Sequence, residues 1–145
     1  MQKITPFLWF DNNFEEAFNF YKAIFKSAKL IDKNPMGGTF ELEGQTFFAL
    51  NGGPMFKFTP AISLYIDCKD QDEVDYYWNK LKADGGAESQ CGWLQDKFGL
   101  SWQVIPKALT NYLSNSDEAV SGRVVEAMMK MTKIEIDKLD KAAKG

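Results

Sequence analysis

One stretch of sequence decides the fold class: residues 4–25, which read ITPFLWFDNNFEEAFNFYKAIF. Residues 4–10 are almost wholly apolar and aromatic, as in a buried strand. Residues 11–13, Asp-Asn-Asn, supply the polar side chains that end a strand and cap a helix. The apolar positions beyond them are Ala17, Phe20, Tyr21, Ile24 and Phe25. Because these positions recur at helical spacing, the stretch predicts a buried strand followed by an amphipathic helix.

Three shorter runs of alternating character follow this helix, and we interpret each of them as a strand. They cover residues 29–33, 38–43 and 46–51. Pro35 and Gly44 fall between them, where turns are expected. The first third of the chain therefore predicts a βαβββ module.

The same order of elements begins again after the turn-rich residues 51–54. A strand is predicted at residues 61–67, and Asp70 is a candidate N-cap for a second helix. The second helical stripe consists of Val74, Tyr77, Trp78 and Leu81, which repeats the spacing of the first stripe displaced from 17 to 74. Further strands are predicted at about 88–92, 93–97 and 100–105. The chain thus predicts two βαβββ modules, with a chance coincidence of four stripe positions as the alternative.

Beyond Pro106 the apolar spacing becomes helical again. The stripe after the candidate cap Asp117 consists of Val120, Val124, Ala127, Met128 and Met131. We expect this tail to pack across the sheets or onto a second subunit. The prediction is one α+β domain spanning residues 1–145, with module 1 at about 1–52, module 2 at about 58–105 and C-terminal helices at about 106–145.

Composition excludes several classes of function. The 145 residues contain no histidine, so an imidazole-based catalytic triad and a histidine-ligated zinc site are both impossible. The formal charge of -3 gives no basic face for nucleic acid. No apolar leader or membrane span is evident, and Cys68 and Cys91 suit reduced thiols, so we expect a cytoplasmic protein.

Three motifs resemble those of a known family: residues 4–10 (ITPFLWF), 49–58 (ALNGGPMFKF) and 91–103 (CGWLQDKFGLSWQ). They are similar to the signatures of the PhnB-like branch of the vicinal-oxygen-chelate superfamily, which includes the glyoxalases and bleomycin-resistance proteins. With the Met-rich tail, the resemblance spans nearly the whole chain. It implies that the two modules pair into a cupped mixed sheet around a ligand, and that the protein forms a homodimer.

The resemblance also implies four positions for metal ligands, one on the first and one on the last strand of each module. Matched strand to strand, these positions are Thr5, Ala49, Ala61 and Gln103. None carries an imidazole or a carboxylate, so we expect no metal and no other cofactor. Members of this branch are often described as ubiquinone-pathway methyltransferases. We expect that description not to apply, because the glycine pairs here are hairpin punctuation rather than a nucleotide-binding turn.

The same four positions predict which side chains line the cup, because side chains alternate along a strand. The predicted lining consists of Thr5, Phe7, Trp9, Phe47, Ala49, Ser63, Tyr65, Cys91, Trp93, Ser101 and Gln103. By the same alternation, Asn51 joins this face. Aromatic rings with a few hydroxyl and amide groups are typical of a small-molecule site. A cup filled by its own side chains is the alternative.

Candidate reactive groups are few. Cys91 lacks an activating histidine, so we interpret it as a structural thiol. Asp67, Glu88 and Asp96 could act as general bases only if burial raised their pKa values, and exposed loop positions are expected for them instead. The leading hypothesis is a protein that binds a small, partly aromatic molecule without a metal. A metal-independent enzyme and a purely structural or interaction module are the alternatives.

Overall fold

A computed structural model describes residues 2–145 of the chain. The fold divides into two compact units, Met1–Phe58 and Thr59–Gly145, and each is described by itself.

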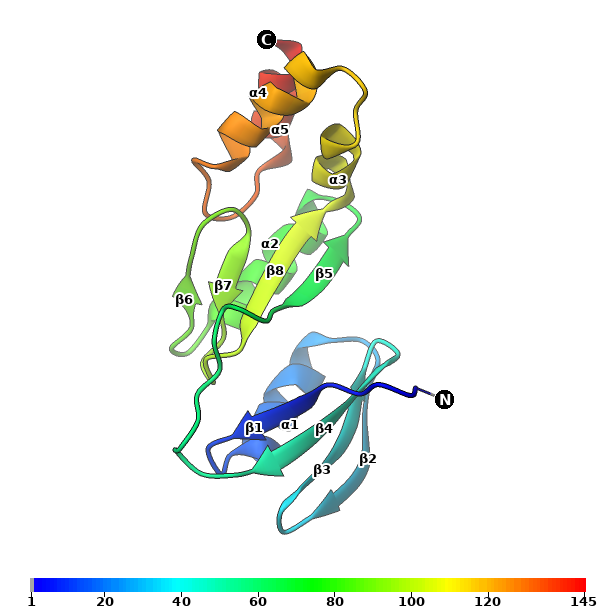
Figure 1. Cartoon of the computed structure of the whole chain (residues 1–145), viewed down its shortest axis with the longest axis vertical. Helices are drawn as coiled ribbons and strands as arrows, with labels where there is room; N and C mark the ends of the chain where they lie inside the picture. The colour runs from blue at the N-terminus through cyan, green and yellow to red at the C-terminus, as the bar shows by residue number, and fades with distance from the viewer. Residues whose placement is uncertain (1) are drawn as a thin grey trace. The chain divides into compact units, whose positions relative to one another are not determined.

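Unit 1 is a four-stranded mixed sheet with one helix (Figure 1). Its elements are β1 (Phe7–Phe10), α1 (Phe14–Ile24), β2 (Ala28–Asn34), β3 (Gly37–Leu42) and β4 (Gln45–Asn51). The strand order is β1-β4-β3-β2, in which β1 and β4 are parallel and the other pairs antiparallel. The first predicted strand thus begins at Phe7 rather than Ile4, and the other predicted elements of this module lie within a residue of their observed bounds.

Helix α1 covers one face of this sheet. Its buried side chains are Phe14, Ala17, Phe18, Tyr21 and Ile24. They meet a sheet layer built around Phe40, whose ring lies 5.7 Å from that of Phe14 and 5.1 Å from that of Phe47. No helix formed by residues 2–58 covers the opposite side of the sheet, and we call that side the helix-free face of unit 1.

Unit 2 repeats this topology. Its sheet contains β5 (Leu64–Cys68), β6 (Ala87–Glu88), β7 (Trp93–Gln95) and β8 (Ser101–Pro106) in the order β5-β8-β7-β6, and α2 (Gln71–Lys82) covers one face. Asp70 is the predicted cap, and its side chain accepts a hydrogen bond from the backbone N–H of Glu73 at 2.9 Å. The predicted α+β class, with two βαβββ modules and C-terminal helices, is confirmed.

The predicted strand at 88–92 is shortened to two residues because the chain turns away. Cys91 and Gly92 have φ values of 60° and 86°. Their amides donate to the carbonyls of Met131 and Thr132 in the tail, at 2.8 and 2.7 Å. These backbone groups therefore pair with the tail instead of extending β6.

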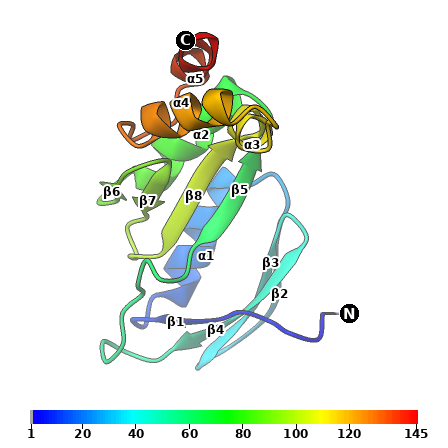
Figure 2. The same cartoon turned by 45° about the horizontal axis from the view of Figure 1, so that its top comes forward.

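The tail forms three helices, α3 (Lys107–Leu113), α4 (Glu118–Met128) and α5 (Ile136–Lys144), gathered near the end of β8 (Figures 1 and 2). Its buried core consists of Ile105, Leu109, Val124, Met131, Ile134 and Leu139. The prediction of a Met-rich stripe is confirmed in part, since Val124 and Met131 are buried whereas Val120 and Met128 are half-buried. None of the helices in residues 2–145 has the length and apolar character needed to cross a bilayer.

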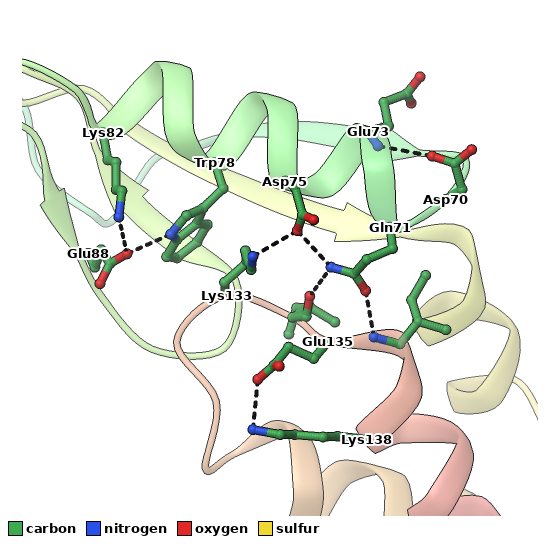
Figure 3. Close-up of polar contacts among 12 residues, drawn as sticks. Asp70, Gln71, Glu73, Asp75, Trp78, Lys82, Glu88, Lys133, Glu135 and Lys138 are labelled. Atoms are coloured by element: carbon green, nitrogen blue, oxygen red, sulfur yellow. Dashed lines mark hydrogen bonds and ion pairs between the residues drawn. The ribbon is translucent and has the colours of Figure 1, made fainter.

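Gln71, at the first turn of α2, fastens the tail to unit 2 (Figure 3). Its side-chain amide donates to the carbonyl of Ile134 at 3.0 Å and accepts from the N–H of Ile136 at 2.7 Å. Lys133 adds an ion pair to Asp75 at 2.8 Å, and its hydrogen bond lowers the pKa of that carboxyl group. The tail helices are therefore an integral part of this unit.

Candidate functional site

Strand pairing shows which side chains of unit 1 lie on its helix-free face. The parallel register places Phe7 opposite Phe48 and Leu8 opposite Ala49. Leu8, Phe47 and Ala49 are buried on the helix side. Phe47, predicted to line the cup, therefore faces the helix, and Phe48 is the ring of β4 on the helix-free face. The side chain of Ala49 also points to the helix side, although Ala49 still borders the groove described below.

Asn51, which the same alternation predicted on the cup face, caps helix α1 instead. Its Oδ1 accepts a hydrogen bond from the N–H of Phe14 at 3.0 Å and so caps α1. Asn13, which holds the N-cap position within the predicted capping stretch 11–13, makes no side-chain capping bond within the described residues. A side chain 37 residues downstream therefore satisfies the helix terminus.

The helix-free face of unit 1 carries an exposed aromatic pair. The side chains of Phe7 and Phe48 are 60% and 41% exposed, and their rings meet edge to face at a centroid distance of 6.1 Å. Both line an open groove of about 320 Å³, which we call the aromatic groove. Its other lining residues are Asp32, Asn34, Met36, Gly37, Gly38, Thr39, Ala49 and Leu50.

A β-bulge in the edge strand gives this groove its polar side. The pairing of β2 with β3 shifts between Leu30 and Asp32, so Leu30 pairs with Phe40 and Asp32 pairs with Thr39. The extra residue reverses the facing of everything after it. Asp32 and Asn34 consequently lie in the aromatic groove, whereas Leu30 faces α1.

Trp9 shares this face but holds the chain that leaves β4. Its indole N–H donates to the carbonyl of Gly53 at 2.9 Å, and its ring meets Phe56 at 4.9 Å. A Cβ at Gly52 would lie 2.3 Å from the indole ring, so only glycine fits there. The glycine-rich motif therefore packs directly against the Trp9 ring, and the indole N–H already has the Gly53 carbonyl as its hydrogen-bond acceptor.

The face of the unit 2 sheet that α2 does not cover, which we call the helix-free face of unit 2 although α3 contacts one end of it, is polar by comparison. Gln103 pairs with Tyr65 on one side and with Trp93 on the other, so these three predicted residues share one face. The Gln103 amide donates to the hydroxyl of Ser63 at 3.0 Å. Ser101 lies on the same face but is buried, and its hydroxyl has no hydrogen-bond partner within residues 2–145.

Two further residues of this face come from the tail helix α3. The Tyr65 hydroxyl lies 3.3 Å from the Thr110 hydroxyl, and Lys107 forms an ion pair with Asp67 at 2.8 Å. The hydrogen bond that Lys107 donates to the Asp67 carboxylate raises the pKa of Lys107. Sequence reasoning missed both residues, because nothing in a helical stripe indicates which strand its polar side will meet.

The remaining predicted residues lie outside the strands. Thr5 precedes β1, and Cys91 lies in a turn, where its backbone N–H donates a hydrogen bond to the carbonyl of Met131.

Cys68, the other cysteine, is fully buried. Burial, followed by the charges of Glu73 and Asp67, raises the pKa of its thiol to about 12. Cys68 is therefore an inert core thiol.

Each of the three candidate carboxylates accepts hydrogen bonds or forms an ion pair in the structure. Glu88 accepts hydrogen bonds from Lys82 at 2.8 Å and Trp78 at 2.7 Å, which lower its pKa (Figure 3). Asp67 is paired with Lys107. The exposed position expected for Asp96 was wrong, because its side chain is 2% exposed.

Asp96 organises the β7–β8 hairpin. Its Oδ1 accepts from the N–H groups of Phe98 and Leu100 at 2.9 and 3.1 Å, and its Oδ2 accepts from the Trp102 indole at 2.9 Å. All three bonds are internal to the hairpin. The carboxylate is thus a structural anchor that the alternation pattern could not reveal.

The side chains at the four implied metal positions do not fit a metal. Ala49 faces α1, and Ala61 precedes β5; neither has a donor atom. Thr5 and Gln103 offer neutral oxygens, and the Gln103 amide is bonded to Ser63. Within residues 2–145, no three His, Cys, Asp or Glu side chains come close enough together to hold an ion.

Comparison with known proteins identifies the family. A family model described as 3-demethylubiquinone-9 3-methyltransferase matches residues 2–105. The PhnB protein from Bacillus cereus is 36% identical, with a TM-score of 0.62, over 72% of this chain and 99% of that protein. The chain belongs to this PhnB-like family. No curated protein matches it significantly.

The PhnB-like fold is shared with more distant structures. Protein PA1353 from Pseudomonas aeruginosa is 19% identical with a TM-score of 0.60, and the match covers 73% of this chain and 98% of that protein. A glyoxalase/bleomycin resistance protein from Albidiferax ferrireducens is 17% identical with a TM-score of 0.50, covering 70% and 95%. The vicinal-oxygen-chelate fold inferred from the motifs is therefore confirmed.

The family match ends where the tail begins. It covers residues 2–105, whereas the sequence motifs led us to expect a resemblance over nearly the whole chain. Helices α3 to α5 lie beyond it, so Lys107 and Thr110 are additions to the PhnB-like modules. One face of unit 2 thus combines family and tail residues.

Proposed function

We propose that this PhnB-like chain binds a small, partly aromatic molecule on the helix-free faces of its sheets, without a metal. The observation that carries the proposal is the aromatic groove of unit 1. Two exposed rings, Phe7 and Phe48, stand beside the carboxylate of Asp32 and the amide of Asn34 in a hollow of about 320 Å³.

The groove has the chemistry that an aromatic ligand needs. Its volume falls at the lower end of small-molecule sites, which measure about 300–1,000 Å³. Exposed rings that already meet edge to face offer a further ring the same geometry. Thr39 and Asn34 supply hydroxyl and amide groups that can orient a ligand hydroxyl or carbonyl.

The helix-free face of unit 2 supports the same class of ligand. Gln103, Ser63 and Tyr65 present an amide and two hydroxyls, and Tyr65 is 54% exposed. With Asp67 and Lys107 paired, this face presents no unpaired charge from them. We therefore propose a neutral, hydrogen-bonding ligand for this face.

The methyltransferase of the family description is not the function that we propose. Enzymes using S-adenosylmethionine ordinarily bind it at the glycine-rich first turn of a doubly wound parallel sheet. Here the first strand leads into Asp11-Asn12-Asn13, and each sheet contains a single parallel strand pair.

A thermal-shift assay tests the proposal with phenol, catechol, benzamide and 2-naphthol as probes. A bound probe at ten times its dissociation constant is expected to raise the melting temperature by about 3–5 °C. A metal chelator should leave that rise unchanged. Failure of all four probes to raise the melting temperature, or loss of the rise with chelator, would contradict the proposal.

Two single-residue variants locate the binding. Phe48→Ala should remove most of the shift, because it deletes one ring of the aromatic groove. Met55→Ala is the matched control, since Met55 is 76% exposed and lies outside the groove. Equal responses of the two variants would argue against the aromatic groove as the site.

A further inference from the structure

Unit 1 contains a second hollow on the opposite side of its sheet, between α1 and β2. Its volume is about 350 Å³, and we call it the α1–β2 groove. Its lining residues are Phe14, Glu15, Phe18, Asn19, Lys22, Ala28, Leu30 and Lys33. It shares no residue with the aromatic groove.

The same β-bulge that shapes the aromatic groove creates this one. Ala28 and Leu30 pair with the inward-facing Leu42 and Phe40, and after the bulge Lys33 pairs with Gly38. A Cβ at Gly38 would meet the ring of Phe14, so this position of β3 faces α1. Its partner Lys33 therefore faces α1 as well. Three residues of the edge strand therefore form one wall.

Helix α1 forms the other wall. Phe14, Phe18 and Lys22 are spaced four residues apart, so they lie along one line of the helix surface. Phe14 and Phe18 are 2% and 5% exposed and make an aromatic floor. Leu30 is 42% exposed because α1 does not cover the edge strand. The hollow thus has apolar walls that reach solvent.

The mouth of the groove is cationic. Lys33 and Glu15 form an ion pair at 3.1 Å that joins β2 to α1, and their charges cancel. Lys22 lies one helical turn beyond Phe18, and within residues 2–145 it has no ion-pair partner. One uncompensated ammonium group therefore borders an apolar hollow, with the Asn19 amide beside it.

We propose that the α1–β2 groove binds a small amphipathic carboxylate, with its apolar body on Phe14, Phe18 and Leu30 and its carboxylate at Lys22. Apolar walls with one unpaired cationic group at the rim favour a ligand that has an apolar body and one anionic group. This proposal stands on a different hollow from the proposed function and does not depend on it.

Isothermal titration calorimetry with 3-phenylpropanoate tests the proposal, with 3-phenylpropan-1-ol as the uncharged analogue. The carboxylate should bind the wild-type chain more tightly than the alcohol. Lys22→Gln should weaken carboxylate binding by about twofold to fivefold, as expected for an exposed charge contact. The same variant should leave binding of the alcohol unchanged.

Lys29→Gln is the matched control, because Lys29 lies on β2 but not in the groove. It should bind 3-phenylpropanoate like the wild type. Equal weakening by the two lysine variants, or an affinity that does not distinguish the carboxylate from the alcohol, would overturn the proposal.

A filling variant separates this groove from the aromatic groove. Ala28→Phe places a ring in the hollow from a half-buried position on the edge strand, and strands favour aromatic residues. It should abolish 3-phenylpropanoate binding with an unchanged melting temperature, whereas Phe48→Ala should not affect it. Loss of binding in Phe48→Ala but not in Ala28→Phe would assign the carboxylate to the aromatic groove and refute this inference.

Discussion

Strands β4 and β8 hold the same place in the two units, yet they face their helices with opposite residue parity. In β8 the even-numbered Trp102 and Val104 are buried under α2, and the half-buried Leu64 of β5 pairs with Trp102 on the same face. In β4 the odd-numbered Phe47 and Ala49 are buried under α1. The parity differs because the paired residues Leu8 and Ala49 are 41 positions apart (49 − 8), whereas Leu64 and Trp102 are 38 apart (102 − 64), so facing cannot be carried from one module to the other by residue number.

The two strands also differ in how clearly their sequences indicate which side chains face the helix. Residues 101–104, Ser-Trp-Gln-Val, alternate between polar and apolar, so their facing can be read from the sequence. Residues 47–50, Phe-Phe-Ala-Leu, are apolar on both faces. Where both faces are apolar, strand pairing alone decides the register, and the sequence pattern cannot.

The largest expected effect compares two neighbouring rings of β4. Phe47→Ala should lower the free energy of unfolding by about 3–5 kcal/mol, because it leaves a cavity beside Phe40. Phe48→Ala should cost less than about 1 kcal/mol, because its ring is 41% exposed. Urea unfolding measures both, and equal costs would refute the assigned facing.

Replacing a carboxylate in the hairpin turn should lower the free energy of unfolding by different amounts in the two units. Asp96→Asn should cost about 2–3 kcal/mol, because an amide nitrogen cannot accept from the groups that the buried carboxylate satisfies. Glu43, in the β3–β4 turn, accepts one exposed hydrogen bond from Ser27 at 2.7 Å. Glu43→Gln should cost less than about 0.5 kcal/mol by the same measurement. A larger loss for Glu43→Gln would reverse the comparison.

Helix capping provides a smaller contrast. Asn51→Ala should cost about 1–2 kcal/mol and Asp70→Ala about 1 kcal/mol, since each removes the side chain that caps its helix. Asn13→Ala should change little, because that side chain makes no capping bond in the described structure. Thermal unfolding checks all three variants. A large loss of stability in Asn13→Ala would show that Asn13 caps the helix after all.

These contrasts also explain what could be predicted from the sequence. The order of elements, the Asp70 cap and the shared face of Tyr65, Trp93 and Gln103 follow from local spacing. The Asn51 cap and the Asp96 anchor do not, because each depends on a partner that the folded chain brings near. Lys107 and Thr110 likewise become site residues only through tertiary packing.

The smallest effect concerns pH. Hydrogen bonds from Lys82 and Trp78 lower the pKa of Glu88 below its ordinary value of 4.5. Its stabilising contribution is therefore complete above that value and is lost as pH falls through the lowered pKa. Glu88→Gln should be less stable than wild type at pH 7 by less than about 1 kcal/mol, because the pair is partly exposed.

That deficit should disappear at low pH, where the wild-type carboxyl group is also neutral. Urea unfolding of both proteins at a series of pH values, from pH 7 down to the most acidic pH at which both still fold, measures how the deficit changes. A deficit that stays constant across this range would show that the carboxylate charge contributes nothing to stability.

The central claim is that a small, partly aromatic molecule binds on the helix-free faces. An amide NMR titration of the ¹⁵N-labelled chain with 2-naphthol tests it most directly. The account predicts saturable shifts centred on Phe7, Thr39 and Phe48, the residues around the exposed aromatic pair. Shifts confined to the α1–β2 groove or the tail, or no shift at saturating 2-naphthol, would contradict it.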